Sequence, residues 1–379
     1  FCRPSVKGIF FHCLHISTQV LLVILAVLLF GLVITIHEFG HFFTAKLCKI
    51  RVNEFSVGMG PQLLSFRKGE TQYSLRLLPI GGYCAMEGEE EDSDDERAFN
   101  RKPVWKRILV VAMGAVMNIL LGLVLMVILV AQTPLLGSNI VARFEDNSAL
   151  QEAGIQVGDR ITSINGYTVR TDRDVQFALS IIGLEGEEEP VVPFTVDREG
   201  QSLTFPEVRL QTTETEDGQR AIVFDFKVLA IPKNVGTVLW KAVEDTVSVV
   251  RLVWQSVYML LTGQFGINDL AGPVGTASVI TQAASAGLES SGFFGALSNI
   301  VYLIMIITVN LGIMNLLPIP ALDGGRLLFL IIEGIVRRPI PRRFEGWITA
   351  AGFIFLIGLM IVVTFSDILR LVTGRGLGA

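Results

Sequence analysis

Long apolar runs alternate with polar, charge-rich segments along this chain. Four runs are long enough to supply the roughly 20 helical residues that cross about 30 Å of hydrocarbon. They lie at residues 18–46, 108–131, 296–317 and 347–371. The pattern predicts an α-helical polytopic membrane protein with four transmembrane helices.

The segment between the second and third runs shows other patterns. Residues 137–228 carry short alternating strands, Gly and Asn turns and two helical stretches, typical of a compact β-rich α+β domain. Residues 236–262 place apolar residues at helical spacing but are interrupted by charges, which favours an amphipathic helix on the membrane surface. A fifth span is the alternative, and it would invert the two spans that follow. Residues 263–295 are expected to be a Gly-rich connection.

Residues 1–17 precede the first run and are expected to be an N-terminal extension, with no role for its two histidines. The apolar stretch at 20–36 resembles a signal-peptide core. The polar motif directly after it, and the lack of a small-residue cleavage site, favour a retained span.

Residues 47–107 separate the first two runs. Within them, residues 52–84 predict β-hairpins with a turn at Lys68–Gly69. The acidic stretch EGEEEDSDDE at 87–96 is expected to be a solvated cytosolic loop.

Lysine and arginine gather in two connections close to span ends. One is the segment 47–107, and the other holds Arg326 and the stretch RRPIPRR at 337–343. The positive-inside rule places both in the cytoplasm. With four spans, both chain ends and the segment 133–295 then lie outside.

Composition agrees with a membrane bundle that carries about one further domain. The chain has 379 residues, of which 51% are hydrophobic and 18% charged, and its mean hydropathy is +0.55. The net charge of −5 gives no reason to expect a nucleic acid partner. Four cysteines without C-x-x-C spacing predict neither a disulfide framework nor a cysteine zinc site.

The main candidate for chemistry is the sequence His-Glu-Phe-Gly-His at 37–41, inside the first apolar run. On a helix, His37 and His41 project from one face one turn apart and can bind one Zn²⁺, with Glu38 as general base. Ionisable residues at membrane depth are costly and point to function. The sequence therefore predicts a hydrolytic zinc site within the bilayer.

A catalytic zinc usually has three protein ligands, and the motif supplies two. Four residues in or near spans are candidates for the third ligand: Asp323, Glu333, Asp367 and Cys48. Asp323 is favoured because two prolines break the helix beside it, as a hydrated pocket requires. A plain helix-ending Asp-Gly turn is the alternative. Spans one and three run in the same direction, so both motifs reach the cytoplasmic leaflet.

The two motifs together resemble the site-2 protease family of intramembrane zinc metalloproteases, peptidase family M50. They are His-Glu-Phe-Gly-His and Asn-x-x-Pro-x-Pro-x-Leu-Asp-Gly at 315–324. The resemblance implies Zn²⁺ as cofactor, His37, His41 and Asp323 as ligands and Glu38 as catalytic base. It also implies substrate binding by Asn315.

Two further features resemble this family. Asn118, in the second run, resembles a family asparagine and is a candidate for substrate binding, with a structural hydrogen bond as the alternative. The segment 52–84 resembles a membrane-associated β-loop near the active site, whose strand edge pairs with unwound substrate. A plain cytosolic hairpin is the alternative.

Residues 137–228 resemble a circularly permuted PDZ module, through Gly158-Asp159-Arg160-Ile161 and Ile164-Asn165-Gly166. Ile140 and Val141 would then lie near a peptide groove. Such a domain binds a peptide end or acts as a size filter, and we favour the filter. The regulators of sigma-E have two such domains, whereas this chain has room for one.

The predicted reaction is peptide-bond hydrolysis within the bilayer, with single-span membrane proteins as substrates. The resemblance implies anti-sigma factors or signal-peptide remnants, in the bacterial cytoplasmic membrane, with the PDZ-like domain outside and the active site toward the cytoplasmic leaflet. Two other classes remain open: a catalytically silent scaffold and a metal transporter.

Overall fold

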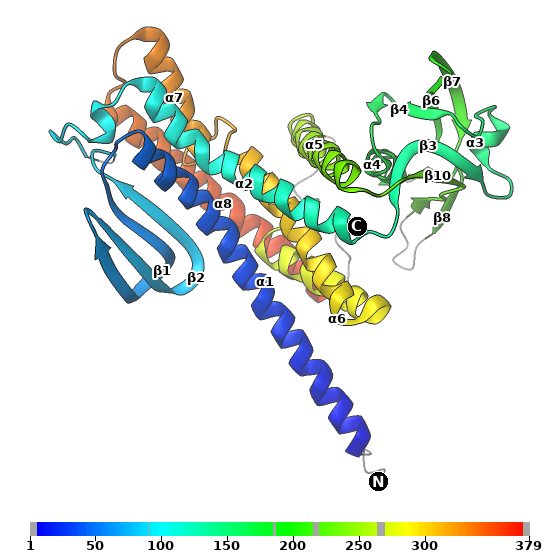
Figure 1. Cartoon of the computed structure of the whole chain (residues 1–379), viewed down its shortest axis with the longest axis horizontal. Helices are drawn as coiled ribbons and strands as arrows, with labels where there is room; N and C mark the ends of the chain where they lie inside the picture. Colours follow the sequence, from blue (N-terminus) through cyan, green and yellow to red (C-terminus); the bar gives the residue numbers. More distant parts are fainter. Residues whose placement is uncertain (1–5, 90, 185–186, 215–219, 264–269, 374–379) are drawn as a thin grey trace. The chain divides into compact units, whose positions relative to one another are not determined.

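The computed structural model describes residues 6–89, 91–184, 187–214, 220–263 and 270–373. The chain divides into two compact units. Phe1–Leu125 and Gly266–Leu369 form one, which we call the helical unit. Met126–Phe265 and Arg370–Ala379 form the other, which we call the β unit. Figure 1 labels most of the helices and strands of both units.

Among the described residues, four helices are long and apolar enough to cross a membrane. They are α1 (Val6–Leu47), α2 (Val104–Gln132), α6 (Pro273–Met314) and α8 (Arg342–Thr373). This confirms the prediction of four candidate spans, although α1 begins within the stretch that we expected to be a separate extension. Apolar side chains on α8 are exposed, including Ile354 at 71% and Phe355 at 66%, as expected of a surface that lipid covers.

The prediction of a Gly-rich connection over 263–295 is wrong from residue 273 onward. There α6 has already begun, and it bends at Ser291 and Gly292, whose φ of 66° is left-handed. The two arms pack together, because Asn299 Nδ2 donates to the carbonyl of Ala283 at 2.8 Å. The many small residues of the first arm look loop-like in the sequence. In the structure they allow close helix packing.

The helix break predicted beside Asp323 is present. Helix α6 ends at Met314, and α7 (Asp323–Val336) begins after a short irregular stretch. A Cβ at Gly324 would overlap the carbonyl oxygen of Leu317. Glycine therefore lets α7 start directly against the preceding turn, which fixes the position of Asp323.

Two long strands, β1 (Val52–Lys68) and β2 (Thr71–Met86), form an irregular sheet beside α1. Residues 54–57 pair with 72–75 on one side and with 82–85 on the other. The last part of β2 therefore forms an edge of this sheet. Apolar side chains anchor the base of the sheet in a core shared with α1, α2 and α7: Ala45, Ile50, Val52, Phe55, Cys84, Val110 and Leu327.

The β unit is built on a sheet with the strand order β10-β3-β4-β6-β7, in which β5 pairs with β4, and on a separate β8–β9 pair. Its strands are β3 (Leu136–Phe144), β4 (Arg160–Ile164), β5 (Tyr167–Thr168), β6 (Val191–Arg198), β7 (Gln201–Arg209), β8 (Thr212–Glu214), β9 (Arg220–Ile222) and β10 (Phe226–Ile231). Helices α3 (Ala149–Glu152) and α4 (Asp172–Leu184) lie where helical patterns were predicted. Phe194, Ile161 and Leu179 belong to its fully buried core.

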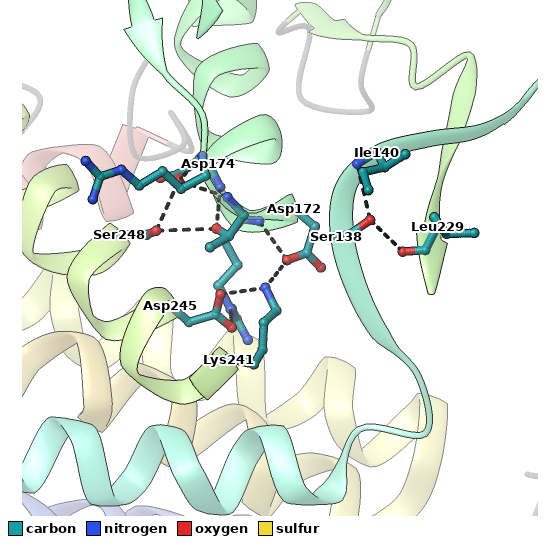
Figure 2. Close-up of polar contacts among 11 residues, drawn as sticks. Ser138, Ile140, Asp172, Asp174, Leu229, Lys241, Asp245 and Ser248 are labelled. Carbon is teal, nitrogen blue, oxygen red and sulfur yellow. Dashed lines mark hydrogen bonds and ion pairs between the residues drawn. The ribbon is translucent and has the colours of Figure 1, made fainter. Parts of the chain in front are cut away.

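Helix α5 (Val235–Leu261) turns its polar face toward α4, as Figure 2 shows. Lys241 Nζ donates to Asp172 at 2.5 Å and to Asp245 at 2.7 Å. Ser248 donates to Asp174 at 3.1 Å. Large apolar side chains of α5 remain exposed: Val235, Leu239, Trp240, Val243, Val247, Trp254, Tyr258 and Leu261. The amphipathic pattern is therefore present, with its polar side bound to α4.

Candidate metal centre

Helix α1 carries His37 and His41 one turn apart, near its C-terminal end. Both residues are 8% exposed. Their Nε2 atoms lie 3.3 Å apart, so the two imidazoles point to a common position. The apolar sequence around them makes α1 a candidate span. This polar pair therefore lies within a segment that could cross the membrane.

Asp323 reaches the same position from the first turn of α7. Its Oδ2 lies 3.0 Å from Nε2 of His37 and 3.3 Å from Nε2 of His41. Among the described residues, these three form the one group of three or more His, Cys, Asp or Glu side chains with converging ligand atoms. The structure thus brings together the three predicted ligands.

The donor set fits zinc in number, type and size. Tetrahedral zinc with bonds of about 2.0–2.1 Å has neighbouring ligand atoms about 3.3 Å apart. The three edges measured here are 3.0, 3.3 and 3.3 Å. Two imidazole nitrogens and a carboxylate oxygen, with a fourth position open, are typical of catalytic rather than structural zinc sites.

Helix α2 contacts the outer side of both imidazoles. Nδ1 of His41 lies 2.9 Å from the carbonyl oxygen of Val110, and Nδ1 of His37 lies 3.3 Å from the side-chain amide of Asn118. Such contacts on the second ring nitrogen orient histidines that bind metals. Residues of α2 therefore orient both rings through contacts on Nδ1, the nitrogen that does not face Asp323.

A cavity of about 720 Å³ opens on this group. His37, Glu38, His41 and Asp323 line it, together with the end of β2 and the segment that follows: Tyr83, Cys84, Ala85, Met86, Glu87, Gly88 and Glu89. Strand β2 passes close to Glu38, because a Cβ at Gly82 would lie 3.4 Å from Cγ of Glu38. A peptide in this cavity would therefore meet both the carboxylate and the strand edge.

The three other candidates for the third ligand have different partners. Arg107 donates to both carboxylate oxygens of Glu333, at 3.1 and 2.5 Å. Asp367 accepts from the backbone N–H of Gly275 at 2.8 Å, at the start of α6. Cys48 is buried in the core below the sheet. These contacts leave Asp323 as the carboxylate beside the histidine pair.

Neither candidate asparagine lines this cavity. Asn315 caps the C-terminus of α6 and is 9% exposed. Asn118 is 0% exposed, and its side chain faces His37. The substrate-binding role of both asparagines therefore stays a prediction.

The prediction of a solvated loop at 87–96 is wrong for its first part. Residues 87–89 and 91–93 line the cavity. Both Nη atoms of Arg326, on α7, bind Glu89: Nη1 contacts its carboxylate and Nη2 donates to its carbonyl at 3.1 Å. Contacts with segments distant in sequence, such as Asn53 to Glu87 and Arg342 to Asp92, also hold this stretch at the cavity, so its local sequence does not predict its place.

A bundle of candidate membrane spans with a His–His–Asp group facing a cavity defines a class of protein, the membrane-embedded metallopeptidases. Comparison with known sequences gives the family. The profile of peptidase family M50 matches residues 25–359. The chain belongs to this family of zinc metalloproteases, the site-2 proteases, and is an integral membrane protein with Zn²⁺ as its cofactor.

Relatives cover nearly the whole chain. A Clostridium acetobutylicum protein named as a candidate zinc metalloprotease is 36% identical, over 91% of this chain and 97% of its own length. The regulator of sigma-W protease RasP of Bacillus subtilis is 30% identical, over 92% of this chain and 98% of its own length. Zinc metalloprotease RasP of Bacillus licheniformis is 31% identical, over 92% and 99%.

Proposed function

We propose that His37, His41 and Asp323 hold the zinc and that Glu38 is the catalytic base of an intramembrane protease. The observation that carries this proposal is the convergence of the three ligand atoms, 3.0–3.3 Å apart, beside Glu38 in one cavity. When bound there, zinc would act as a Lewis acid that polarises the scissile carbonyl and activates water. Glu38 accepts the proton of the attacking water and delivers it to the leaving amine.

The free edge of β2 supports a proposal for how the substrate is held next to the metal centre. A helix whose carbonyls are all hydrogen-bonded resists cleavage, so the substrate must be extended near the scissile bond. Among the described residues, 82–85 pair with β1 alone, and 83–85 line the cavity. We propose that an unwound substrate segment pairs with this edge by β-augmentation, which holds its carbonyl near Glu38.

The proposed substrates are single-span membrane proteins, cut within or near their transmembrane segments. The Bacillus subtilis relative is named regulator of sigma-W protease, which supports an anti-sigma factor as substrate. Signal-peptide remnants share the same physical form, a single apolar helix. The bilayer itself is the second partner, since the cavity lies at the end of a candidate span.

We place the protein in the bacterial cytoplasmic membrane with its active site toward the cytoplasmic leaflet. Support comes from Lys49 and Arg51 directly after α1 and from the basic stretch 337–343, which leads into the first turn of α8. The β unit is then extracytoplasmic.

The β unit is proposed to be a PDZ-like size filter. Ile140 lies on β3, which has β10 on one side and β4 on the other, so a peptide cannot add to that strand. This argues against a groove at Ile140, although β10 keeps an edge. The outward apolar face of α5, with Trp240, Trp254 and Tyr258 exposed, suits the membrane interface.

Zinc content and cleavage, measured on the same purified full-length proteins, test the ligand set. We expect Asp323→Ala to lose bound zinc and all cleavage of a model transmembrane substrate. Glu38→Gln is expected to keep zinc and to lose cleavage by at least about 100-fold, because the proton acceptor is gone.

Glu333→Gln and Asn315→Asp provide controls that are expected to retain zinc. Zinc bound at the wild-type level in Asp323→Ala would overturn the ligand set. Cleavage at the wild-type rate by Glu38→Gln would overturn the proposed role of Glu38.

A further inference from the structure

Three residues of α2 lie one turn apart along the face that meets the metal centre: Val110, Gly114 and Asn118. Residues four apart in a helix stack on one face. The carbonyl of Val110 meets His41, and the side chain of Asn118 meets His37. The outer edges of both imidazoles are thus contacted by a single helix face.

Gly114 is the middle of this face and makes room for the rings. A Cβ there would overlap Nε2 of His41 and would lie 2.8 Å from Cε1 of His37. No other residue allows both imidazoles to lie this close to α2. The position of the rings against α2 is therefore set by the absence of a side chain at residue 114.

The contacts on Nδ1 decide which ring nitrogen carries the proton. A neutral imidazole that binds metal through Nε2 carries its proton on Nδ1, and that N–H needs an acceptor. A carbonyl can only accept, so Val110 fixes His41 in this tautomer. Asn118 can do the same for His37 only if its Oδ1, rather than its Nδ2, faces the ring.

In the zinc-binding tautomer of His37, Asn118 must take that orientation, because its Nδ2 would otherwise face the protonated Nδ1, a donor against a donor. Its Oδ1 is buried and, among the described residues, has no hydrogen-bond partner. Rotation of the amide by half a turn exchanges two groups of nearly equal shape. It turns Oδ1 toward Nδ1 of His37 at the same position.

We propose that Asn118 is a positioning residue, whose Oδ1 accepts from Nδ1 of His37 and so directs the Nε2 lone pair of His37 at the zinc. This assigns Asn118 to the metal centre instead of to the substrate. Its complete burial and its absence from the cavity lining agree with this role. The inference rests on the proposed zinc ligands.

The test is the rate at which zinc leaves the protein. Full-length variants in detergent, loaded with one equivalent of zinc, are mixed with excess chelating indicator, and zinc release is followed by absorbance. Asn118→Leu keeps the approximate shape and removes the acceptor, so we expect release about 10–100-fold faster than in the wild type. Asn118→Asp keeps an acceptor and is expected to release zinc at close to the wild-type rate.

Thr308→Val is the matched control. Thr308 Oγ1 donates to the backbone carbonyl of Asn118 at 3.2 Å and is also fully buried. This variant removes a buried hydrogen bond to the backbone of Asn118 and leaves the contact between the Asn118 side chain and the imidazole in place. We expect no acceleration of zinc release. Equal acceleration in Thr308→Val and Asn118→Leu would show a general packing effect and would overturn the proposal.

His37→Ala separates this inference from the proposed ligand set. If His37→Ala releases zinc no faster than the wild type, the ligand set fails. If it releases zinc rapidly while Asn118→Leu releases it at the wild-type rate, only the positioning role fails. A raised KM in Asn118→Leu, with zinc release unchanged, would return Asn118 to substrate binding.

Discussion

At the scale of single residues, several charged side chains of low exposure meet a partner from a distant segment. Asp323 meets the histidine pair, and Arg107 meets Glu333. In the β unit, Arg198 donates to both oxygens of Asp159, each at 2.7 Å. Paired burial avoids the penalty of an isolated buried charge.

The Asp159–Arg198 pair predicts a pH dependence of the β unit. The hydrogen bonds from Arg198 lower the pKa of Asp159 below its ordinary value. A lowered folded-state pKa stabilises the fold above the unfolded pKa of about 3.9, and this contribution is lost as pH falls through the folded pKa. We therefore expect protection of the turn at 154–159 against hydrogen exchange to fall as the pH drops below about 4.

Hydrogen exchange of the full-length protein, corrected for the intrinsic effect of pH, measures this protection. Asp159→Asn removes the titrating group, so its protection in that turn is expected to be lower and independent of pH in this range. A pH dependence in Asp159→Asn equal to that of the wild type would contradict the assignment to Asp159.

At the scale of elements, helices in this chain are positioned by polar contacts at their faces and ends. The polar face of α5 is bound to α4 through Lys241, Asp172 and Asp245 (Figure 2). Arg173 also contacts Asp245, at 3.0 Å. Because this face is bound to α4, the exposed face of α5 is the apolar one, which is the face that the proposed contact with the membrane interface would use.

Lys241→Met is expected to weaken the packing of α5 against α4. The change leaves Asp172 and Asp245 without their shared cation, and the loss of one partner of a buried pair costs about 3–5 kcal/mol. Because Arg173 still contacts Asp245, we expect the lower end, about 3 kcal/mol. The free energy of local opening of α5, from hydrogen exchange in detergent, measures the effect.

Lys227→Met is the control, since this lysine is 54% exposed and 3.5 Å from Glu145. Its expected cost is below about 1 kcal/mol. A cost for Lys241→Met no larger than that of Lys227→Met would show that the buried ion pairs do not hold α5.

At the scale of the whole molecule, the proposed topology makes a direct prediction. The acidic segment and the β unit are expected on opposite sides of the membrane. Basic residues lie in the connection between the first two spans and in the connection between the last two, which places both connections in the cytoplasm. In a cysteine-free background, Asp94→Cys and Ser202→Cys place one thiol on each side. Both positions are exposed.

A maleimide that cannot cross membranes is expected to label Ser202→Cys in intact cells whose outer layers are permeable. Asp94→Cys is expected to react only after the membrane is disrupted. Labelling of both positions in intact cells would contradict this topology. Labelling of Asp94→Cys alone would reverse it.

Local patterns in the sequence predicted much of this protein. Hydropathy over some 20 residues determined the four candidate spans. Whether a segment is long and apolar enough to cross a bilayer depends on that segment alone. Helical spacing placed His37 and His41 on one face of α1, with Glu38 between them. The two prolines before Asp323 predicted the end of α6.

Tertiary structure decided what depends on contacts between distant segments. Four side chains were candidates for the third ligand, and only the packing of α7 against α1 brings Asp323 to the histidines. The same kind of contact turned Asn118 toward His37, drew residues 87–89 and 91–93 to the cavity and made a helix of the small residues after 273. Hydropathy and spacing predict which solvent each segment and each of its faces prefers. Which side chains meet depends on how the helices pack.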